Sequence, residues 1–328
     1  MQSLNRPLLS MEFKNFCAYI ERRTKEEVLY MPKFGISTYS IRTRIEEGEW
    51  TPEQAIAWIG SRGAEVTEIV PFVIDMAADP SLVDRCLRAA DDSGVKIDNF
   101  SQNAVFLRIP QDAYEAELKR VKEAIDIAGR LGVSTMRIDM NSVRRPAEEA
   151  TTEDFIEDFP LIVDTYKRLC DYAQRYGFKI LLENHMYFVN GSERTAAILH
   201  AMKGYNFGAQ LDVGNFACVD ERPEIAVEKN VGYAAVVHMK DFYRRSRDQD
   251  PGYVEAGRHG RPWLRTVRQD YLRGSIVGQG DLDIRRILSV IKGSGFDGSF
   301  FVEYEGIEDC EYGTALSFDN LLRLYREA

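Results

Sequence analysis

Short apolar runs alternate with longer segments of helical periodicity from residue 33 to the C-terminus. The runs are rich in β-branched and aromatic residues and are bounded by glycine or polar residues, which predicts strands. The predicted strands cover residues 33–38, 65–70, 96–101, 134–140, 179–185, 206–212, 234–241 and 299–305. Because helical segments separate them, they predict βαβ units and a parallel sheet.

Helical periodicity fills the intervals between the predicted strands. One helix is predicted to begin at Thr51-Pro52, because a capping residue there precedes a proline at the first helical position. The other helices cover roughly 80–92, 113–130, 152–176, 192–202, 222–230, 283–293 and 315–326. Several helices are followed by a glycine, where a left-handed C-cap is expected. These glycines are Gly94, Gly132, Gly177, Gly204 and Gly295.

Eight strands that alternate with eight helices predict an α/β fold of the (β/α)₈ TIM-barrel type. A doubly wound open sheet is the alternative, but no G-x-G-x-x-G turn follows the first strand. Residues 1–32 have helical spacing and end at Pro32, so we expect a short helical N-terminal extension before a barrel domain that spans 33–328. The extension either covers the bottom of the barrel or contacts a partner.

The helix expected after the seventh strand is delayed by a long segment, roughly 242–280, which is rich in arginine, aspartate, glycine and aromatic residues. A connection of this length in a compact domain is usually functional or disordered. On a barrel it would lie over the end that carries active sites. We therefore expect a long loop after strand seven, which is either functional or a surface elaboration without chemistry.

The charge balance limits the possible partners. The chain has 42 Lys and Arg residues against 52 Asp and Glu residues, a net charge of −10. Phosphate binding needs a basic face, so a nucleic-acid partner is not expected, whereas a small sugar is compatible. There is no 18-residue apolar run and no signal-peptide pattern, so no membrane association is expected. Five scattered cysteines without a C-x-x-C pair indicate reduced thiols, and we expect a cytoplasmic protein.

Four polar residues stand at or near the C-terminal ends of consecutive predicted strands: Glu183, Asp212, His238 and Glu303. These ends carry the active site of a barrel, so we expect the four side chains to converge. A single strand-end carboxylate is more often a helix cap or an ion-pair partner. Four residues at equivalent positions on consecutive strands are not explained in that way.

Two glutamates, one aspartate and one histidine form an oxygen- and nitrogen-donor set that suits Mn²⁺, Mg²⁺, Co²⁺ or Zn²⁺ and lacks the thiolates of a structural zinc site. Burial of three carboxylates in the mouth of a sheet is costly unless a positive charge pairs with them. The sequence therefore predicts one bound divalent cation, which could be any of these four.

Strand periodicity identifies further side chains on the same inner face, because residues two apart point the same way. His185 shares the face of Glu183, and its ordinary pKa suits proton transfer near neutrality; a hydrogen bond to Glu183 is the alternative role. Lys240 would either steady a substrate oxygen or form an ion pair with Glu303 or Glu305. The candidate substrate contacts are Arg137, Gln210 and Glu305.

A metal ion with a nearby base suits one type of reaction. The cation binds a carbonyl and the adjacent hydroxyl, and a carboxylate or histidine removes the α-hydrogen to give a metal-held enediolate. Reprotonation elsewhere gives isomerisation or epimerisation, and loss of a β-substituent gives elimination. The sequence leaves these outcomes open.

Five motifs resemble those of the xylose isomerase-like sugar phosphate isomerase/epimerase family: LLENH, LDVGNF, VVHMKDF, GQGDLD and FDGSFFVEYEG. The resemblance covers about residues 33–328 and implies a TIM barrel with a Mn²⁺-type ion at Glu183, Asp212, His238 and Glu303. In ketose epimerases of the family the two metal-bound glutamates also form the acid/base pair. By that resemblance, Glu183 and Glu303 would carry protons here.

The chain also departs from those epimerases. The epimerases carry a D-x-x-H motif after the sixth strand, whereas in this chain the residue three positions after Asp212 is Asn215. This difference argues against C3-epimerisation of a free ketohexose. The ENH triplet, the arginine-rich segment and the N-terminal extension look more like a branch that acts on 3-keto sugars and C-glycosides. That branch includes a metal-binding subunit that eliminates the aglycone with a histidine base, matched by His185, and that works with a small β-rich partner chain.

We therefore expect a divalent-metal-dependent isomerase or epimerase of a sugar or keto-sugar. The alternatives are a C-glycoside deglycosidase subunit, which is a carbon–carbon lyase, and an inactive barrel that serves as a binding or scaffold subunit. The expected partners are a small sugar or glycoside substrate, with assembly as a homo-oligomer or, for a deglycosidase, with the β-rich subunit. The four histidines are too few for the trinuclear zinc site of the related endonuclease IV type.

Overall fold

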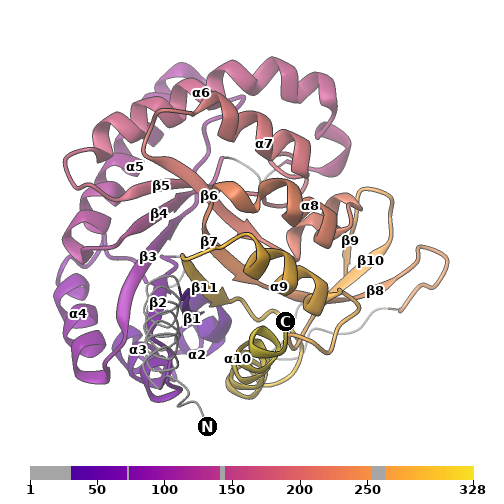
Figure 1. Ribbon diagram of the computed structural model, residues 1–328. Coiled ribbons are helices and arrows are strands. Elements are labelled where there is room, and N and C mark those ends of the chain that lie inside the picture. Colours follow the sequence, from indigo (N-terminus) through magenta and orange to yellow (C-terminus); the bar gives the residue numbers. More distant parts are fainter. Residues whose placement is uncertain (1–30, 72–73, 141–144, 253–262) are drawn as a thin grey trace, which may run out of the picture.

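The computed structural model describes residues 31–71, 74–140, 145–252 and 263–328. Eight parallel strands close into a barrel, and helices surround it (Figure 1). The barrel is closed because β1 pairs with both β2 and β11, so the predicted TIM barrel is confirmed and the open sheet is wrong. Around the barrel the strands are β1 (Lys33–Ser37), β11 (Ser299–Val302), β7 (Ala234–Met239), β6 (Phe207–Asp212), β5 (Lys179–Glu183), β4 (Thr135–Ile138), β3 (Lys96–Gln102) and β2 (Val66–Ile69).

The helices lie close to their predicted positions. Thr51 and Gln54 form a capping box at the start of α3, and Asp283 caps α9. The last helix was predicted to start near residue 315 but begins at Cys310, because the Asp309 side chain caps it. The helices are α2 (Arg42–Glu46), α3 (Pro52–Ser61), α4 (Ser81–Ser93), α5 (Gln111–Leu131), α6 (Thr152–Ala173), α7 (Ser192–Ala201), α8 (Pro223–Asn230), α9 (Ile284–Gly293) and α10 (Cys310–Glu327).

The interior of the barrel is layered. Four buried residues, Val66, Leu181, Val236 and Phe301, form an apolar cluster separate from the main core between the barrel and its helices. Since side chains two apart on a strand share a face, the next inward-facing residue on each of these strands is polar. Those polar residues are Glu68, Glu183, His238 and Glu303. An apolar layer therefore lies directly beneath a polar layer at the C-terminal mouth.

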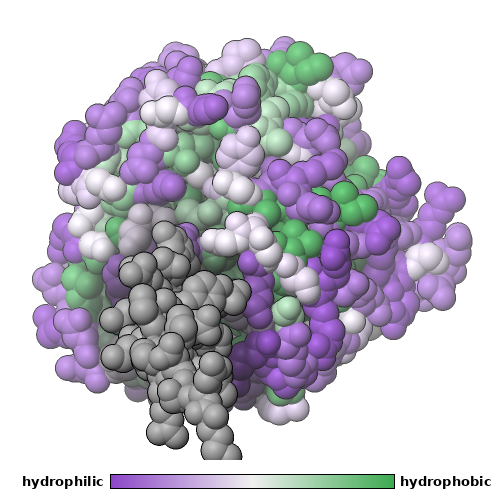
Figure 2. Space-filling model, viewed as in Figure 1, coloured by the Kyte–Doolittle hydropathy of each residue, from purple (hydrophilic) through white to green (hydrophobic). Residues whose placement is uncertain are grey.

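The segment after β7 is more ordered than the predicted loop. It contains a three-stranded antiparallel sheet in the order β8 (Asp241–Arg245), β10 (Tyr271–Ser275) and β9 (Leu264–Arg265). This sheet projects from the barrel (Figure 1), and its visible surface is mainly hydrophilic (Figure 2). Phe242 and Leu272 pack on Ala217 and Cys218 beside the barrel. The strands are short and rich in arginine, so their apolar pattern was too weak to predict them.

Asp241 fastens the start of this arm to the turn before α9. Its Oδ2 accepts hydrogen bonds from the backbone N–H groups of Gly278 and Gly280, each at 2.9 Å, and its Oδ1 accepts one from Phe242 at 2.8 Å. Position 280 requires glycine, because a Cβ there would lie 2.2 Å from Asp241 Oδ1. The GQG of the GQGDLD motif is therefore a backbone cradle for a carboxylate.

The remaining predictions about the chain as a whole have different outcomes. Residues 1–30 of the predicted N-terminal extension lie outside the described residues. Within the described ranges, no helix is long and apolar enough to cross a membrane. The four cysteines in those ranges are free and buried, as expected for core residues: Cys86, Cys170, Cys218 and Cys310.

We predict that Asp241→Ala weakens the fold. The substitution removes the acceptor of several backbone N–H groups, and an unpaired buried donor costs about 1–3 kcal/mol. Water can accept some of the hydrogen bonds that the carboxylate accepted. We therefore expect the free energy of unfolding, measured in urea, to fall by about 3 kcal/mol. Asp248→Ala, whose side chain is 88% exposed in the same arm, should change it by less than about 0.5 kcal/mol. Equal effects of the two variants would contradict the cradle.

A second carboxylate, Asp98 on β3, ties the bottom of the barrel together. Its Oδ2 accepts a hydrogen bond from Ser299 Oγ on β11 at 2.8 Å, and its Oδ1 accepts from Ser134 Oγ and Lys96 Nζ, each at 2.6 Å. Burial raises the pKa of Asp98, but Lys96 and the two hydroxyls lower it by more, so the pKa lies below the ordinary 3.8. The carboxylate thus connects strands that are not neighbours in the barrel.

We predict a pH-dependent effect of Asp98→Asn. A carboxyl whose pKa is lower in the folded state stabilises the fold above its unfolded pKa, and this stability is lost as pH falls through the folded pKa. The variant should be less stable than the natural chain by about 1–2 kcal/mol at pH 7, and the difference should shrink below about pH 4. Urea unfolding at pH 7, 5 and 3 measures it, with exposed Asp91→Asn as the control. A difference that stays constant with pH would rule out the ionised form as the cause.

Candidate metal centre

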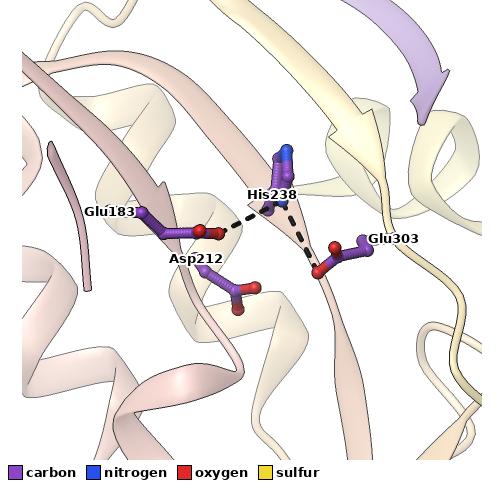
Figure 3. A group of neighbouring side chains, drawn as sticks. All are labelled: Glu183, Asp212, His238 and Glu303. Atoms are coloured by element: carbon purple, nitrogen blue, oxygen red, sulfur yellow. Dashed lines mark ion pairs between the residues drawn. The ribbon is translucent and has the colours of Figure 1, made fainter. Parts of the chain in front are cut away.

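The four strand-end residues predicted as ligands meet at the C-terminal mouth of the barrel (Figure 3). Glu183 and Asp212 end β5 and β6, His238 lies within β7, and Glu303 directly follows β11. One ligand atom from each residue lies within 4.8 Å of the other three. The side chains are at most 9% exposed. The sequence prediction that the four converge is thus matched by one buried cluster.

Backbone and amide groups orient Asp212. Its Oδ1 accepts hydrogen bonds at 2.9 Å from the backbone N–H groups of Gly214 and Asn215. Asn184, just after β5, donates to the Asp212 carbonyl at 2.8 Å and accepts from the Asp212 N–H at 3.0 Å. These bonds end the ladder between β5 and β6, which explains why β5 is two residues shorter than predicted. Oδ2 of Asp212 is left to face the cluster.

His238 connects the cluster to the opposite wall of the barrel. Its Nδ1 lies 3.6 Å from Glu183 Oε1 and 3.5 Å from Glu303 Oε2, which are ion-pair contacts too long for hydrogen bonds (Figure 3). Its Nε2 lies 2.9 Å from Oε1 of Glu68 on β2. The imidazole therefore has one nitrogen on the cluster and the other against a buried carboxylate that the sequence analysis missed.

Lys240 places a positive charge beside the cluster. Its Nζ lies 2.5 Å from Glu303 Oε2, 3.1 Å from Asp212 Oδ2 and 3.3 Å from Glu305 Oε2. Burial alone would lower the pKa of Lys240, but these carboxylates raise it well above the ordinary 10.5. Both ion pairs considered for Lys240 are therefore present, and its predicted contact with a substrate oxygen stays a prediction.

One lysine does not compensate the crowded carboxylates. Burial raises the pKa of Asp212, Lys240 lowers it, and the charges of Glu303 and Glu183 raise it, so that the pKa lies at about 7. In addition, Asp212 Oδ2 and His238 Nδ1 are buried and have no hydrogen-bond partner among the described residues. Burial of polar atoms without hydrogen bonds is unfavourable, so a further positive group between the carboxylates would stabilise the cluster.

The donor atoms fit a divalent cation. Three carboxylates and one imidazole provide oxygen and nitrogen ligands that suit Mn²⁺, Mg²⁺, Co²⁺ or Zn²⁺. Asp212 Oδ2 and His238 Nδ1, which make ion-pair contacts but no hydrogen bonds, belong to this group of ligand atoms. A cation there would pair with the carboxylates and accept the free lone pair of the imidazole. The residues present therefore fit one such ion.

Arg137 and Gln210, two of the predicted substrate contacts, lie against the cluster rather than at its open side. Arg137 Nε is 3.0 Å from Glu183 Oε2, and its Nη1 donates to Asn103 Oδ1 at 2.6 Å. Gln210 is fully buried, and its Nε2 donates to Glu183 Oε1 at 3.3 Å. Both contacts hold Glu183 in place, and a direct role in substrate binding stays a prediction, as it does for Glu305.

His185 lies at the more open edge of the cluster. Its side chain is 20% exposed, and its Nδ1 is 3.1 Å from Asp139 Oδ2 and 4.0 Å from Glu183 Oε2. Burial lowers the pKa of His185, but the Asp139 carboxylate raises it by more, so the pKa lies above its ordinary value. Asp139 is thus the partner of His185. Asp139 directly follows β4, and the sequence analysis did not identify it as the partner of His185.

A model of the xylose isomerase-like TIM barrel family matches residues 54–324. The chain therefore belongs to this family, as its motifs had suggested. No curated protein sequence matches the chain at a significant level.

Solved structures with the same fold include three of interest. A xylose isomerase-like TIM barrel protein from Mycobacterium smegmatis, in complex with magnesium, is 16% identical, has a TM-score of 0.60, and aligns over 83% of this chain and 89% of its own. D-psicose 3-epimerase from Clostridium cellulolyticum H10, with D-tagatose, is 13% identical, has a TM-score of 0.65, and aligns over 89% of this chain and 99% of its own. The 3-keto-D-glucoside 4-epimerase from E. coli is 13% identical, has a TM-score of 0.63, and aligns over 90% of this chain and 100% of its own. At these identities the similarity establishes the fold.

We predict that Asp212→Asn and His238→Ala each abolish stoichiometric binding of a divalent cation. Each removes one of four donors, so the affinity should fall by more than the roughly 100-fold that loss of an outer partner costs. Elemental analysis and calorimetric titration with Mn²⁺ measure this. Asp98→Asn, which neutralises a buried carboxylate at the other end of the same barrel, should bind like the natural chain. Unchanged binding in the Asp212 and His238 variants would mean that the cation sits elsewhere.

Proposed function

We propose that the chain is a divalent-metal-dependent enzyme that moves a proton next to the carbonyl of a sugar or keto-sugar, as an isomerase or epimerase. The observation that carries this proposal is the buried cluster of three carboxylates and one imidazole at the catalytic end of the barrel. Family membership supports it, and so do the structural neighbours that are themselves sugar epimerases. The particular sugar and stereocentre are not part of the proposal.

A divalent cation held by Glu183, Asp212, His238 and Glu303 would act as a Lewis acid that polarises the carbonyl and makes the neighbouring C–H more acidic. The side chains around it supply the rest. Glu183 and Glu303 approach from the ends of β5 and β11, on two sides of the cluster. Two carboxylates on different sides suit removal of a proton from one face of a carbon and its return to the other.

His185 is the third candidate proton carrier. Its contact with Asp139 assigns the Nδ1 hydrogen to that carboxylate, which leaves the Nε2 lone pair available for a substrate proton. Asp139 would also stabilise the imidazolium that forms after proton transfer. Because His185 is more exposed than the candidate ligands, it lies where a substrate would first meet the site.

Two cations would stabilise the negative charge that develops on the substrate. Lys240 contacts Glu303 and Glu305 and lies beside the cluster, where a fixed positive charge favours an enolate oxygen. Arg137 contacts Glu183, with Arg137 Nε 3.0 Å from Glu183 Oε2. Both side chains are buried, so their charges act at short range in a site with little water to screen them.

Elimination from a C-glycoside is the second candidate function, and the His185–Asp139 pair favours it. This pair lies outside the ligand set, so it offers a base that is independent of the cation. In a 3-keto-C-glycoside the base would remove the proton at C2 and a C1–C2 double bond would form. The C1–aglycone bond would break at the same time, and the aglycone carbon would take up a proton. This function would go with a small β-rich partner subunit, whereas the isomerase would form a homo-oligomer.

We predict that His185→Ala keeps the cation and loses turnover. The imidazole is not among the four ligands, so Mn²⁺ affinity should stay within about threefold, while loss of a general acid/base should lower kcat by about 10²–10⁴-fold. The assay incubates 3-keto-O-glycosides, 3-keto-C-glycosides and free ketoses with enzyme and Mn²⁺ in D₂O. It follows deuterium incorporation by NMR and aglycone release by chromatography. His200→Ala, at an exposed position on α7, is the matched control.

The outcomes separate the proposals. Deuterium at a substrate carbon without release of an aglycone supports isomerase or epimerase chemistry, and aglycone release supports elimination. Full activity of His185→Ala would limit His185 to a structural role. A natural chain that binds no divalent cation, or that binds one but exchanges no deuterium with any of these substrates, would overturn the enzyme proposal and favour a binding or scaffold subunit.

A further inference from the structure

Glu68 is a buried carboxylate to which neither the ligand set nor the proposed chemistry gives a role. It lies on β2, across the barrel from β5 and β6, and its exposed fraction is zero. We propose that Glu68 is the positioning residue of the metal centre, which sets the orientation of His238 directly and that of Glu183 through Asn99 and Gln210. The inference rests on the proposed cation site and assigns the residue that prepares it.

The first branch of this network is the direct contact of Glu68 with His238. Glu68 Oε1 and His238 Nε2 lie 2.9 Å apart in a buried ion-pair contact, and neither atom makes a hydrogen bond to any described residue. With the Nε2 hydrogen on the side of Glu68, the Nδ1 lone pair faces the cluster. A carboxylate behind a ligand histidine fixes the tautomer and the ring orientation, and it raises the basicity of the nitrogen that binds the ion.

The second branch of the network passes through side chains of β3 and β6. Glu68 Oε2 accepts hydrogen bonds from Asn99 Nδ2 at 2.7 Å and from Ser101 Oγ at 3.0 Å. The same Asn99 amide donates its other hydrogen to Gln210 Oε1 at 2.8 Å, and Gln210 Nε2 donates to Glu183 Oε1 at 3.3 Å. One carboxylate therefore touches one candidate ligand directly and reaches a second through two amides.

The orientation of these amides is fixed by the chain. The Glu68 carboxylate can only accept, so the Asn99 amide nitrogen has to face it, and Asn99 Oδ1 then accepts from the Thr135 hydroxyl at 2.8 Å. Gln210 must then present its oxygen to Asn99 and its nitrogen to Glu183. Reversal of either amide would place two donors or two acceptors against each other. The network therefore has one consistent direction, and it begins at the acceptor Glu68.

The negative charge of Glu68 is the part that a neutral side chain cannot replace. A glutamine has one acceptor and one donor end, but Glu68 has His238 Nε2 2.9 Å from Oε1 as an ion-pair contact and accepts hydrogen bonds from Asn99 and Ser101 on Oε2. Glu68→Gln would set an N–H group against a donor or force His238 into the other tautomer, with a hydrogen on Nδ1. Either change disturbs the cluster while the shape of the side chain is conserved.

The test measures metal binding rather than turnover. We expect Glu68→Gln to bind Co²⁺ and Mn²⁺ roughly 10- to 100-fold more weakly than the natural chain, in competition with a chelator. The visible absorption of bound Co²⁺ should also shift, because it depends on ligand geometry. Glu68→Asp keeps the negative charge but has a shorter side chain, so it should restore neither the affinity for the metal ion nor the absorption spectrum of bound Co²⁺. Asn99→Ala interrupts only the second branch of the network, so its loss of affinity for the metal ion should be smaller.

Asp98→Asn is the matched control, since it neutralises a buried carboxylate in the same barrel away from the cluster. If the natural chain and Asp98→Asn bind the ion and Glu68→Gln binds it equally well with the same spectrum, the inference fails and the proposed function stands. An equal loss in Asp98→Asn would assign the effect to a loosened barrel and would also overturn the inference. If the natural chain binds no ion, the proposed function fails first.

Discussion

Crowding of negative charge in an enclosed space is the constraint on which the rest of this structure depends. Glu68, Glu183, Asp212 and Glu303 all lie in the polar layer of the barrel, and each is at most 9% exposed. Carboxylates in such a place are unfavourable unless cations or hydrogen-bond donors surround them. Among the described residues, their ion pairs run to Arg137, Lys240 and the two histidines. These groups leave Asp212 with a pKa raised to about 7.

The layered interior explains how the barrel accommodates this charge. Apolar side chains such as Leu181 and Phe301 fill the lumen directly beneath the polar layer and exclude water from below. Amides from the inner faces of β3 and β6 then provide donors where water would otherwise be needed. Buried polar networks of this kind are rigid when every member is satisfied. Several of the buried atoms that lack a hydrogen bond among the described residues belong to this layer: Glu68 Oε1, Glu183 Oε2, Asp212 Oδ2 and both nitrogens of His238.

The arm after β7 distinguishes the mouth of this barrel. β8 follows β7 after a single residue, Lys240, so the strand that carries His238 continues into the antiparallel sheet. Asp241 and its glycine cradle hold the junction, and Arg244 bonds to Asp220 and Asp270 on the outer side. Barrels of one family differ in function mainly through such elements at their C-terminal ends. A shared fold with known epimerases therefore does not by itself define a substrate for this chain.

Much of the fold, and the convergence of the four candidate ligands, followed from the sequence. Short apolar runs separated by helical segments predict a barrel because strand and helix periodicity are local properties. Glu183, Asp212, His238 and Glu303 were recognisable because each interrupts an apolar run near its end, and equivalent ends of parallel strands meet at one mouth. The antiparallel arm was missed because its strands are two to five residues long and are stabilised by contacts with residues distant in sequence, such as Cys218.

What only the tertiary structure decided is which polar residues touch. Glu68 and His238 are 170 positions apart in the sequence, and nothing in either local pattern pairs them; the closed barrel sets them 2.9 Å apart. The same holds for Asp139 with His185 and for Asn99 with Gln210. Periodicity fixes which face of a strand a side chain occupies. The partner it meets across the lumen depends on barrel closure and on the stagger between strands, which are properties of all eight strands together.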